Sequence, residues 1–185
     1  MKTKQLLLLF GVVALIQLAI PVSMIWSNQQ TIEKGIAYKF KTAPIDPNNP
    51  FVGKYIALRY TLESFPSKDS TWEGGDPVFI YLTKDADGFA AIKKAVKTKD
   101  QNSSDDFVMA KVNYAFDGNV HFSLPFNTYY MEEGKAYDAE VAYRQQVSDT
   151  TSFHTYAIVH IKDGNAVLSD VMINNIPIQD YVAKK

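Results

Sequence analysis

The chain contains no cysteine, and this absence excludes several kinds of chemistry. A protein without thiols has no disulfide bonds, no thiol nucleophile and no thiolate ligand for zinc. The redox compartment stays open, because an exported domain without disulfide bonds and a cytosolic domain look alike in cysteine content.

Histidine is scarce, with only His121, His154 and His160 in the chain. On one continuous strand, His154 and His160 would share a face but lie about 20 Å apart, too far for one metal ion. The chain has no His-x-His or HExxH pattern and no glycine-rich phosphate-binding loop. The sequence therefore predicts no metal site and no cofactor.

An excess of positive charge is also missing. The chain has 19 basic and 20 acidic residues, a net charge of -1. Without Lys2 and Lys4, which precede an apolar segment, 17 basic residues stand against 20 acidic ones. Binding to nucleic acid requires a concentrated basic face. The sequence therefore excludes nucleic acid as a partner.

Patterns of catalytic residues are absent as well. No G-x-S-x-G segment is present to place a serine nucleophile. Acidic pairs occur at Glu132-Glu133 and Asp105-Asp106, but adjacent residues of a strand point to opposite faces and do not act together. The sequence therefore identifies no catalytic residue, and it predicts a protein that is not an enzyme.

One long apolar run is present, from Leu6 to Trp26. Its roughly 21 uncharged residues would form a helix of about 31 Å, long enough to cross a bilayer. This predicts a transmembrane anchor over residues 1–26, with its N-terminus in the cytoplasm because of the two lysines before the run. A cleaved signal peptide is the alternative, but the run is longer than a signal core and no small-x-small cleavage site follows it.

The remainder reads as a juxtamembrane segment over residues 27–35, which extends the helix to near Gly35, and one domain over residues 36–185. Short runs rich in β-branched and aromatic residues alternate there with Asp-Gly and Asn-rich turns, which is typical of an antiparallel β domain, a sandwich or a barrel-like fold. Residues 89–97 fit both a helix and a hairpin strand, and we favour the strand. The expected strands cover 36–42, 53–62, 78–83, 89–97, 107–115, 120–124, 139–147, 152–162 and 166–173.

The strand from Gly53 to Leu62 follows a turn with three prolines and two asparagines, which can continue neither a helix nor a central strand. In this strand Tyr55 and Arg59 face one way, and Leu58 and Tyr60 face the other. Leu58 and Tyr60 are therefore expected in the core.

This region carries a specific spacing of residues, G-x-Y-x-x-L-x-Y. A second block, Tyr129–Lys135, contains Glu133 and Gly134, and a third, His160–Leu168, reads as a final hairpin. With these blocks the chain resembles the GDYXXLXY family of bacterial membrane-anchored proteins, although Lys54 stands where the family has aspartate. The matching residues of the turn and the motif are Pro44, Asp46, Pro47, Gly53, Tyr55, Leu58 and Tyr60.

The resemblance implies a single-pass protein of the bacterial inner membrane with its β domain outside the cytoplasm, encoded near polytopic membrane proteins. It implies no reaction. The motif has two interpretations. In the first it determines the fold: Leu58 and Tyr60 lie in the core, Gly53 allows close backbone approach and Asp46 organises the proline turn. In the second, Tyr55, Arg59 and the proline turn form a contact surface for a partner near the membrane. The function that we predict is a non-catalytic interaction module, an accessory subunit of a membrane complex. The alternative is a cell-envelope hydrolase whose carboxylates the sequence does not identify. The oligomeric state stays open.

Overall fold

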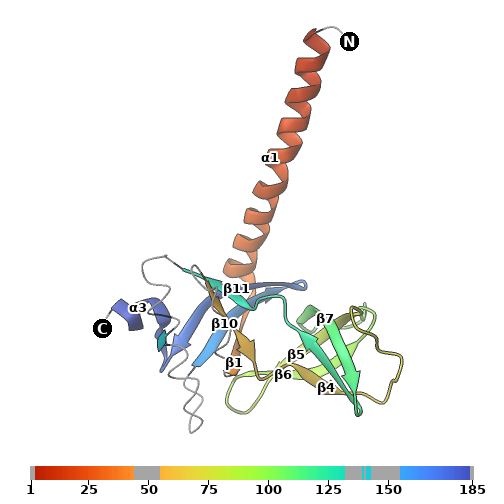
Figure 1. Cartoon of the computed structure of the whole chain (residues 1–185), viewed down its shortest axis with the longest axis vertical. Helices are drawn as coiled ribbons and strands as arrows, with labels where there is room; N and C mark the ends of the chain where they lie inside the picture. Colours follow the sequence, from red (N-terminus) through yellow and green to blue (C-terminus); the bar gives the residue numbers. More distant parts are fainter. Residues whose placement is uncertain (1–2, 44–54, 132–138, 140, 143–154, 184–185) are drawn as a thin grey trace.

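The computed structural model describes residues 3–43, 55–131, 139, 141–142 and 155–183. A single long helix projects from a β domain (Figure 1). This helix, α1, runs without a break from Thr3 to Lys34, through Pro21 and through the polar stretch after Trp26. It is long and apolar enough to cross a membrane, and its most apolar window is entirely exposed in the isolated chain.

The described part of the β domain consists of antiparallel sheets. Strands β12, β11, β10, β1 and β3 form one sheet in that order, and β4, β8, β7, β5 and β6 form a second, while β2 pairs with β9 alone. The bounds are β1 Ile36–Ala43, β2 Tyr55–Ala57, β3 Arg59–Tyr60, β4 Ser64–Pro66, β5 Pro77–Lys84, β6 Ala90–Val96, β7 Phe107–Phe116, β8 Asn119–Ser123, β9 Thr128–Tyr130, β10 Thr155–Lys162, β11 Asn165–Ile173 and β12 Ile176–Pro177, followed by helix α3 Ile178–Ala183.

Tight turns set the register of several hairpins. Their two central residues both have positive φ, the geometry of the type I′ turn, whose twist matches that of the paired strands. Only glycine, asparagine and aspartate adopt this backbone readily, which explains the Asp-Gly and Asn-Asn pairs of the sequence. The turns are Asp117-Gly118 (φ 47° and 71°), Asp163-Gly164 (53° and 86°) and Asn174-Asn175 (52° and 64°).

The ambiguous segment 89–97 forms strand β6, as predicted, and pairs with β5 along its length. Asp85 fixes the turn between the two strands. Its Oδ1 accepts hydrogen bonds from the N–H groups of Asp87 at 3.0 Å and Phe89 at 2.8 Å. The turn and the pairing partner therefore outweigh the helical preference of the alanines and lysines in β6.

The prediction of one continuous strand over 53–62 is wrong in the described part. The chain forms two short strands there, because it passes from one sheet to another at Leu58, whose N–H donates to the carbonyl of Asn127 at 2.8 Å. Strand β2 pairs with β9, whereas β3 pairs with β1. The alternation of faces survives this change: Tyr55 and Arg59 are exposed, and Leu58 and Tyr60 are buried.

A second correction concerns the strand expected over 139–147. Ala139, Val141 and Ala142 are helical, and the two alanines are buried at 0% and 2% exposure. Residues three apart share one face of a helix, so the alanines can pack together against the core. Alanine also has the highest helix propensity, which the alternating pattern of hydrophobic residues concealed.

One hydrophobic core joins the sheets, and it confirms the prediction of a mainly β fold with antiparallel, barrel-like sheets. Its centre holds a set of three rings. Phe40 of β1, Tyr60 of β3 and Phe126 pack edge to face, with centroids 5.0 to 5.7 Å apart. Such geometry suits the quadrupoles of aromatic rings. Outside this cluster, Tyr38 of β1 donates to Asp106 at 3.0 Å, and burial together with this contact raises the pKa of Tyr38 to about 12.

The helix α1 meets the β domain without a flexible linker. Gly35 alone separates it from β1, and the Gly35 N–H donates to the carbonyl of Thr31 at 2.9 Å. A Cβ atom at Gly35 would collide with backbone carbonyl oxygens of the helix and of β10. Asn165, the first residue of β11, donates its Nδ2 to Thr31 Oγ1 at 2.8 Å. These contacts hold the helix in a fixed direction relative to the sheet.

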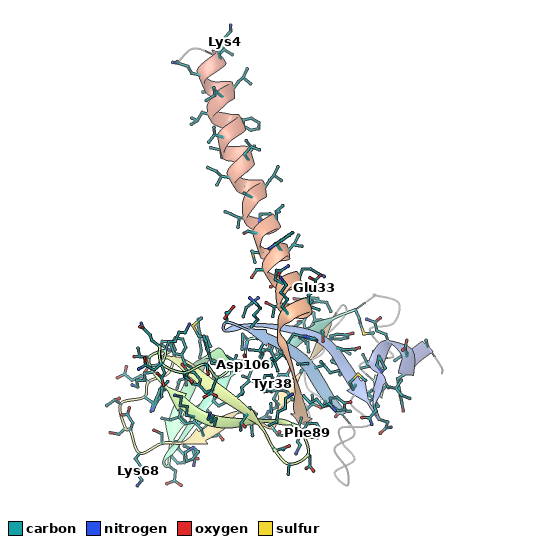
Figure 2. The ribbon with its side chains drawn as sticks, turned by 180° about the vertical axis from the view of Figure 1, so that it is seen from behind. Lys4, Glu33, Tyr38, Lys68, Phe89 and Asp106 are labelled. Carbon is teal, nitrogen blue, oxygen red and sulfur yellow. The ribbon has the colours of Figure 1, made fainter. Side chains whose placement is uncertain are left out.

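Figure 2 shows the consequence for the molecule as a whole. Glu33 lies where α1 meets the domain, Lys4 lies at the distant end of the helix, and Lys68 lies on the side of the domain remote from α1. If α1 crosses a bilayer, the domain is therefore held at a fixed height and orientation above it.

Candidate functional site

The structure brings two of the motif blocks into contact. Tyr55 of β2 lies opposite Tyr130 of β9, and Ile56 lies opposite Tyr129. The rings of Tyr55 and Tyr130 have centroids 5.9 Å apart. We call this two-stranded unit, Tyr55–Ala57 with Thr128–Tyr130, the aromatic ribbon.

The two faces of the aromatic ribbon differ. Ile56 and Tyr129 are buried, whereas Tyr55 is 37% exposed and Tyr130 is 72% exposed. Strand β9, teal in Figure 1, lies on the side of the domain where α1 ends. The aromatic ribbon therefore carries a pair of exposed tyrosines, and its strand β9 lies on this side of the domain. Large, amphipathic aromatic side chains of this kind are enriched at protein interfaces.

The other motif residues fulfil a structural role. Leu58 is 6% exposed and Tyr60 is 4% exposed. The Tyr60 hydroxyl donates to the carbonyl of Phe126 at 2.8 Å, which ties β3 to the chain between β8 and β9. The expectation that Leu58 and Tyr60 are core residues is thus confirmed.

Arg59 lies on the exposed face between these two buried residues. Its guanidinium binds Glu63 through two hydrogen bonds, Nη2 to Oε1 at 3.1 Å and Nε to Oε2 at 3.2 Å. The carboxylate of Glu63 raises the pKa of Arg59. The pair borders an open cleft of about 300 Å³, whose lining includes Asn113 and Asn127. Because both partners are largely exposed, the pair contributes little to stability and remains accessible to a partner.

Six of the predicted site residues lie outside the part of the chain that the structure describes. Their roles therefore stay predictions, including the proline turn as a contact surface. These residues are Pro44, Asp46, Pro47, Gly53, Glu133 and Gly134.

A partly buried polar cluster behind the aromatic ribbon was not predicted. The Tyr129 hydroxyl donates to Asp170 Oδ1 at 3.3 Å and accepts from Gln179 Nε2 at 3.1 Å. The same carboxyl oxygen accepts from the N–H of Val171 at 2.7 Å. Burial raises the pKa of both Tyr129 and Asp170. The contacts join β9 to β11 and α3, and Tyr129 is 41 residues from Asp170 and 50 from Gln179 in the sequence, so no local pattern signals them.

Most other acidic groups in the described ranges are surface groups with their own partners. Asp76, Asp85, Asp100, Asp105 and Asp163 each form an ion pair with a lysine. Hydrogen bonds to the carboxylate lower the pKa of each one. An acid stabilised in its charged form on the surface is suited to a turn or cap rather than to proton transfer.

The histidines that the structure describes do not converge. His121 stacks on Tyr114 with ring centroids 4.5 Å apart, and His160 lies in β10. His160 Nδ1 is buried without a hydrogen-bond partner. Among residues 3–43, 55–131, 139, 141–142 and 155–183, no three histidine or acidic residues cluster to hold a metal ion.

Comparison with known proteins agrees with the motif. The family model described as GDYXXLXY protein matches residues 17–171, most of the chain. The chain therefore belongs to the GDYXXLXY family, and the resemblance drawn from its motif blocks is confirmed. No curated protein and no solved structure matches the chain.

Proposed function

We propose that this member of the GDYXXLXY family is a membrane-anchored interaction module, an accessory subunit of a bacterial membrane protein complex without a reaction of its own. In this proposal α1 crosses the inner membrane with its N-terminus in the cytoplasm. The β domain lies outside the cytoplasm and contacts a polytopic membrane protein. The observation that carries the proposal is the exposed Tyr55–Tyr130 pair of the aromatic ribbon, whose strand β9 lies on the side of the domain where the helix ends (Figure 1).

The junction between helix and domain supports this role. Asn165 and Gly35 hold α1 against the sheet, so the aromatic ribbon stays at one height above the bilayer. A surface held in place near the membrane favours binding to a neighbour in the same membrane, because little orientational freedom is lost on binding. A flexible linker would suit a domain that reaches distant substrates.

The competing function, a cell-envelope hydrolase, would need acidic groups that converge in a cleft. In the described ranges, Asp170 is the carboxyl whose pKa burial raises. Its Oδ1 is already engaged by Tyr129 and the backbone of Val171. This arrangement supports a structural role for Asp170, and thereby the non-catalytic proposal.

The proposal is tested by purifying the tagged full-length protein from its native membranes in mild detergent. Tyr55→Ala and Arg59→Ala are compared with the wild type, since both residues are exposed and neither side chain is part of the core. Tyr114→Ala is the matched control, because Tyr114 is also an exposed tyrosine but lies on β7, outside the aromatic ribbon. Circular dichroism shows whether each variant keeps its fold.

We expect one polytopic protein to co-purify in a fixed ratio with the wild type and with Tyr114→Ala. Its recovery should fall with folded Tyr55→Ala. If no membrane protein co-purifies with the wild type, or if Tyr114→Ala loses it to the same extent as Tyr55→Ala, the proposed contact surface is wrong.

A further inference from the structure

Gln17 is an unusual residue in α1 because of where it lies. It occupies the middle of the uncharged run from Leu6 to Trp26, which would place it near the centre of a bilayer. Its side chain makes no hydrogen bond within the described structure. The other polar side chain of the run, Ser23, donates its hydroxyl to the carbonyl of Ile20 at 2.7 Å. The Ser23 hydroxyl therefore has a hydrogen-bond partner within its own helix, and the Gln17 side chain has none there.

Pro21 adds a second unsatisfied group at the same place. In an α-helix the carbonyl of residue 17 would accept from the N–H of residue 21, but proline has no N–H. Pro21 lies inside α1. The backbone oxygen of Gln17 therefore lacks its helical donor, directly beside a side-chain amide that also lacks a partner. In hydrocarbon each such group costs free energy unless another protein group pairs with it.

We call the side-chain amide and the backbone carbonyl of Gln17 the polar notch. The face of α1 on which the polar notch lies follows from helical periodicity. Gln17 and Asn28 are eleven residues apart, about three full turns, so they share one face of α1. Asn28 Oδ1 lies 3.4 Å from Asn165 Nδ2 at the start of β11. The polar notch therefore lies on the side of α1 above which the β10–β11 hairpin is packed.

We propose that the polar notch is the docking point for a transmembrane helix of a different membrane protein. That helix presents a hydrogen-bond donor at mid-bilayer, such as a hydroxyl or amide side chain. This inference rests on the proposed function and names where, within the membrane, the partner binds. Ala14, one turn before Gln17, is small enough to let a neighbouring backbone approach, as is common where membrane helices pack.

The helix that docks at the polar notch belongs to a different protein, because the fold obstructs a second copy of this chain at that face. Two copies packed in parallel through this face would bring their β10–β11 hairpins against each other, since Asn28 and Asn165 occupy the same side just beyond the membrane. The hairpin begins only about 16 Å along the axis from Gln17. A partner helix that ends at the membrane surface passes beneath the hairpin without collision.

The experiment is photo-crosslinking of the full-length protein in its native membranes. A photoreactive amino acid replaces Ala14, on the side of the polar notch, or Ala19, which lies almost opposite Gln17 because two residues turn a helix by about 200°. Both positions are alanines of the same apolar run, so they form a matched pair. Each is combined with the wild-type residue at 17 or with Gln17→Leu, which keeps the helix apolar and removes the amide. Ser23→Ala is the control for removal of a self-satisfied polar group.

We expect the Ala14 position, but not the Ala19 position, to crosslink to one membrane protein of different sequence. Gln17→Leu should reduce this product by roughly three- to twentyfold, the range that corresponds to one hydrogen bond between membrane helices, while Ser23→Ala leaves it unchanged. A product of twice the chain's own mass, equal crosslinking from both positions, or crosslinks to lipid alone would overturn the inference. If the partner still co-purifies through Tyr55 but gives no Ala14 product, only this inference fails; if no partner co-purifies at all, the proposed function fails.

Discussion

The division of the motif into buried and exposed tyrosines gives a quantitative expectation for stability. Tyr60→Phe removes the hydroxyl that donates to Phe126 at 2.8 Å. One such hydrogen bond contributes about 1 kcal/mol to the free energy of unfolding. For a chain of this size that loss corresponds to a decrease of about 2–4 °C in the unfolding temperature.

Tyr60→Ala removes the whole ring and its edge-to-face contacts with Phe40 and Phe126. Replacing a buried aromatic residue by alanine costs about 3–5 kcal/mol. Total stabilities are commonly about 5–15 kcal/mol, so this variant should be severely destabilised. Tyr55→Ala should cost about 1 kcal/mol or less, because Tyr55 is one member of an exposed cross-strand pair.

The assay is thermal unfolding of the full-length protein in detergent, followed by near-UV circular dichroism. The expected order of unfolding temperatures is wild type, then Tyr55→Ala and Tyr60→Phe close together, then Tyr60→Ala far below. If Tyr55→Ala destabilised the protein as much as Tyr60→Ala, the assignment of Tyr55 to a contact surface would be wrong, and the motif would serve the fold alone.

Three further expectations concern other parts of the molecule. A Cβ atom added at Gly164 (φ +86°) would lie 2.5 Å from the Phe107 side chain, whereas one added at Gly118 (φ +71°) would meet open space. Gly164→Ala should therefore lower the free energy of unfolding in urea by about 1–3 kcal/mol more than Gly118→Ala. Equal losses would contradict the clash. Burial raises the pKa of Asp170 above its value in the unfolded chain, so the stability of the wild type falls as pH rises from the unfolded pKa, about 4, to the raised one. Asp170→Asn should therefore be more stable than the wild type at pH 7 and lose this advantage below about pH 4. A stability difference that does not change with pH would refute the burial argument. Asn165→Ala removes a hydrogen bond to α1 and should broaden the distances between spin labels on the helix and the domain, which the cysteine-free chain allows to be placed freely; an unchanged distribution would show that Asn165 does not hold the helix.

Much of the fold is predictable because local chemistry determines it. The Asp-Gly and Asn-Asn turns adopt the positive φ values that their residue types favour. The alternation around Leu58 correctly separated buried from exposed side chains, even though the strand itself is broken there. What the sequence concealed is non-local. Only the pairing of β2 with β9 and of β3 with β1 shows that the chain changes sheets at Leu58.

The same reasoning explains which parts of the candidate site were found and which were missed. Tyr55 and Arg59 were identified because their alternation with Leu58 predicts an exposed face. The aromatic ribbon requires Tyr130, which lies far along the chain and resembles any exposed strand tyrosine in sequence. Asp170 was missed for a similar reason, since the rise of its pKa comes from burial in the folded domain, which no neighbouring residue in the sequence signals.

The aromatic ribbon and the polar notch together limit the shape of a partner. One lies on the side of the domain where α1 ends, and the other lies in the middle of α1. The junction at Gly35 allows little movement between helix and domain. A partner that contacts both must therefore lie within the membrane beside α1 and also extend to the membrane surface below β9. Loss of Tyr55 or of Gln17 alone should weaken such a complex. Asn165→Ala leaves both contacts in place but loosens the frame that holds them, so it should weaken the complex as well, because the second contact then forms at a lower effective concentration.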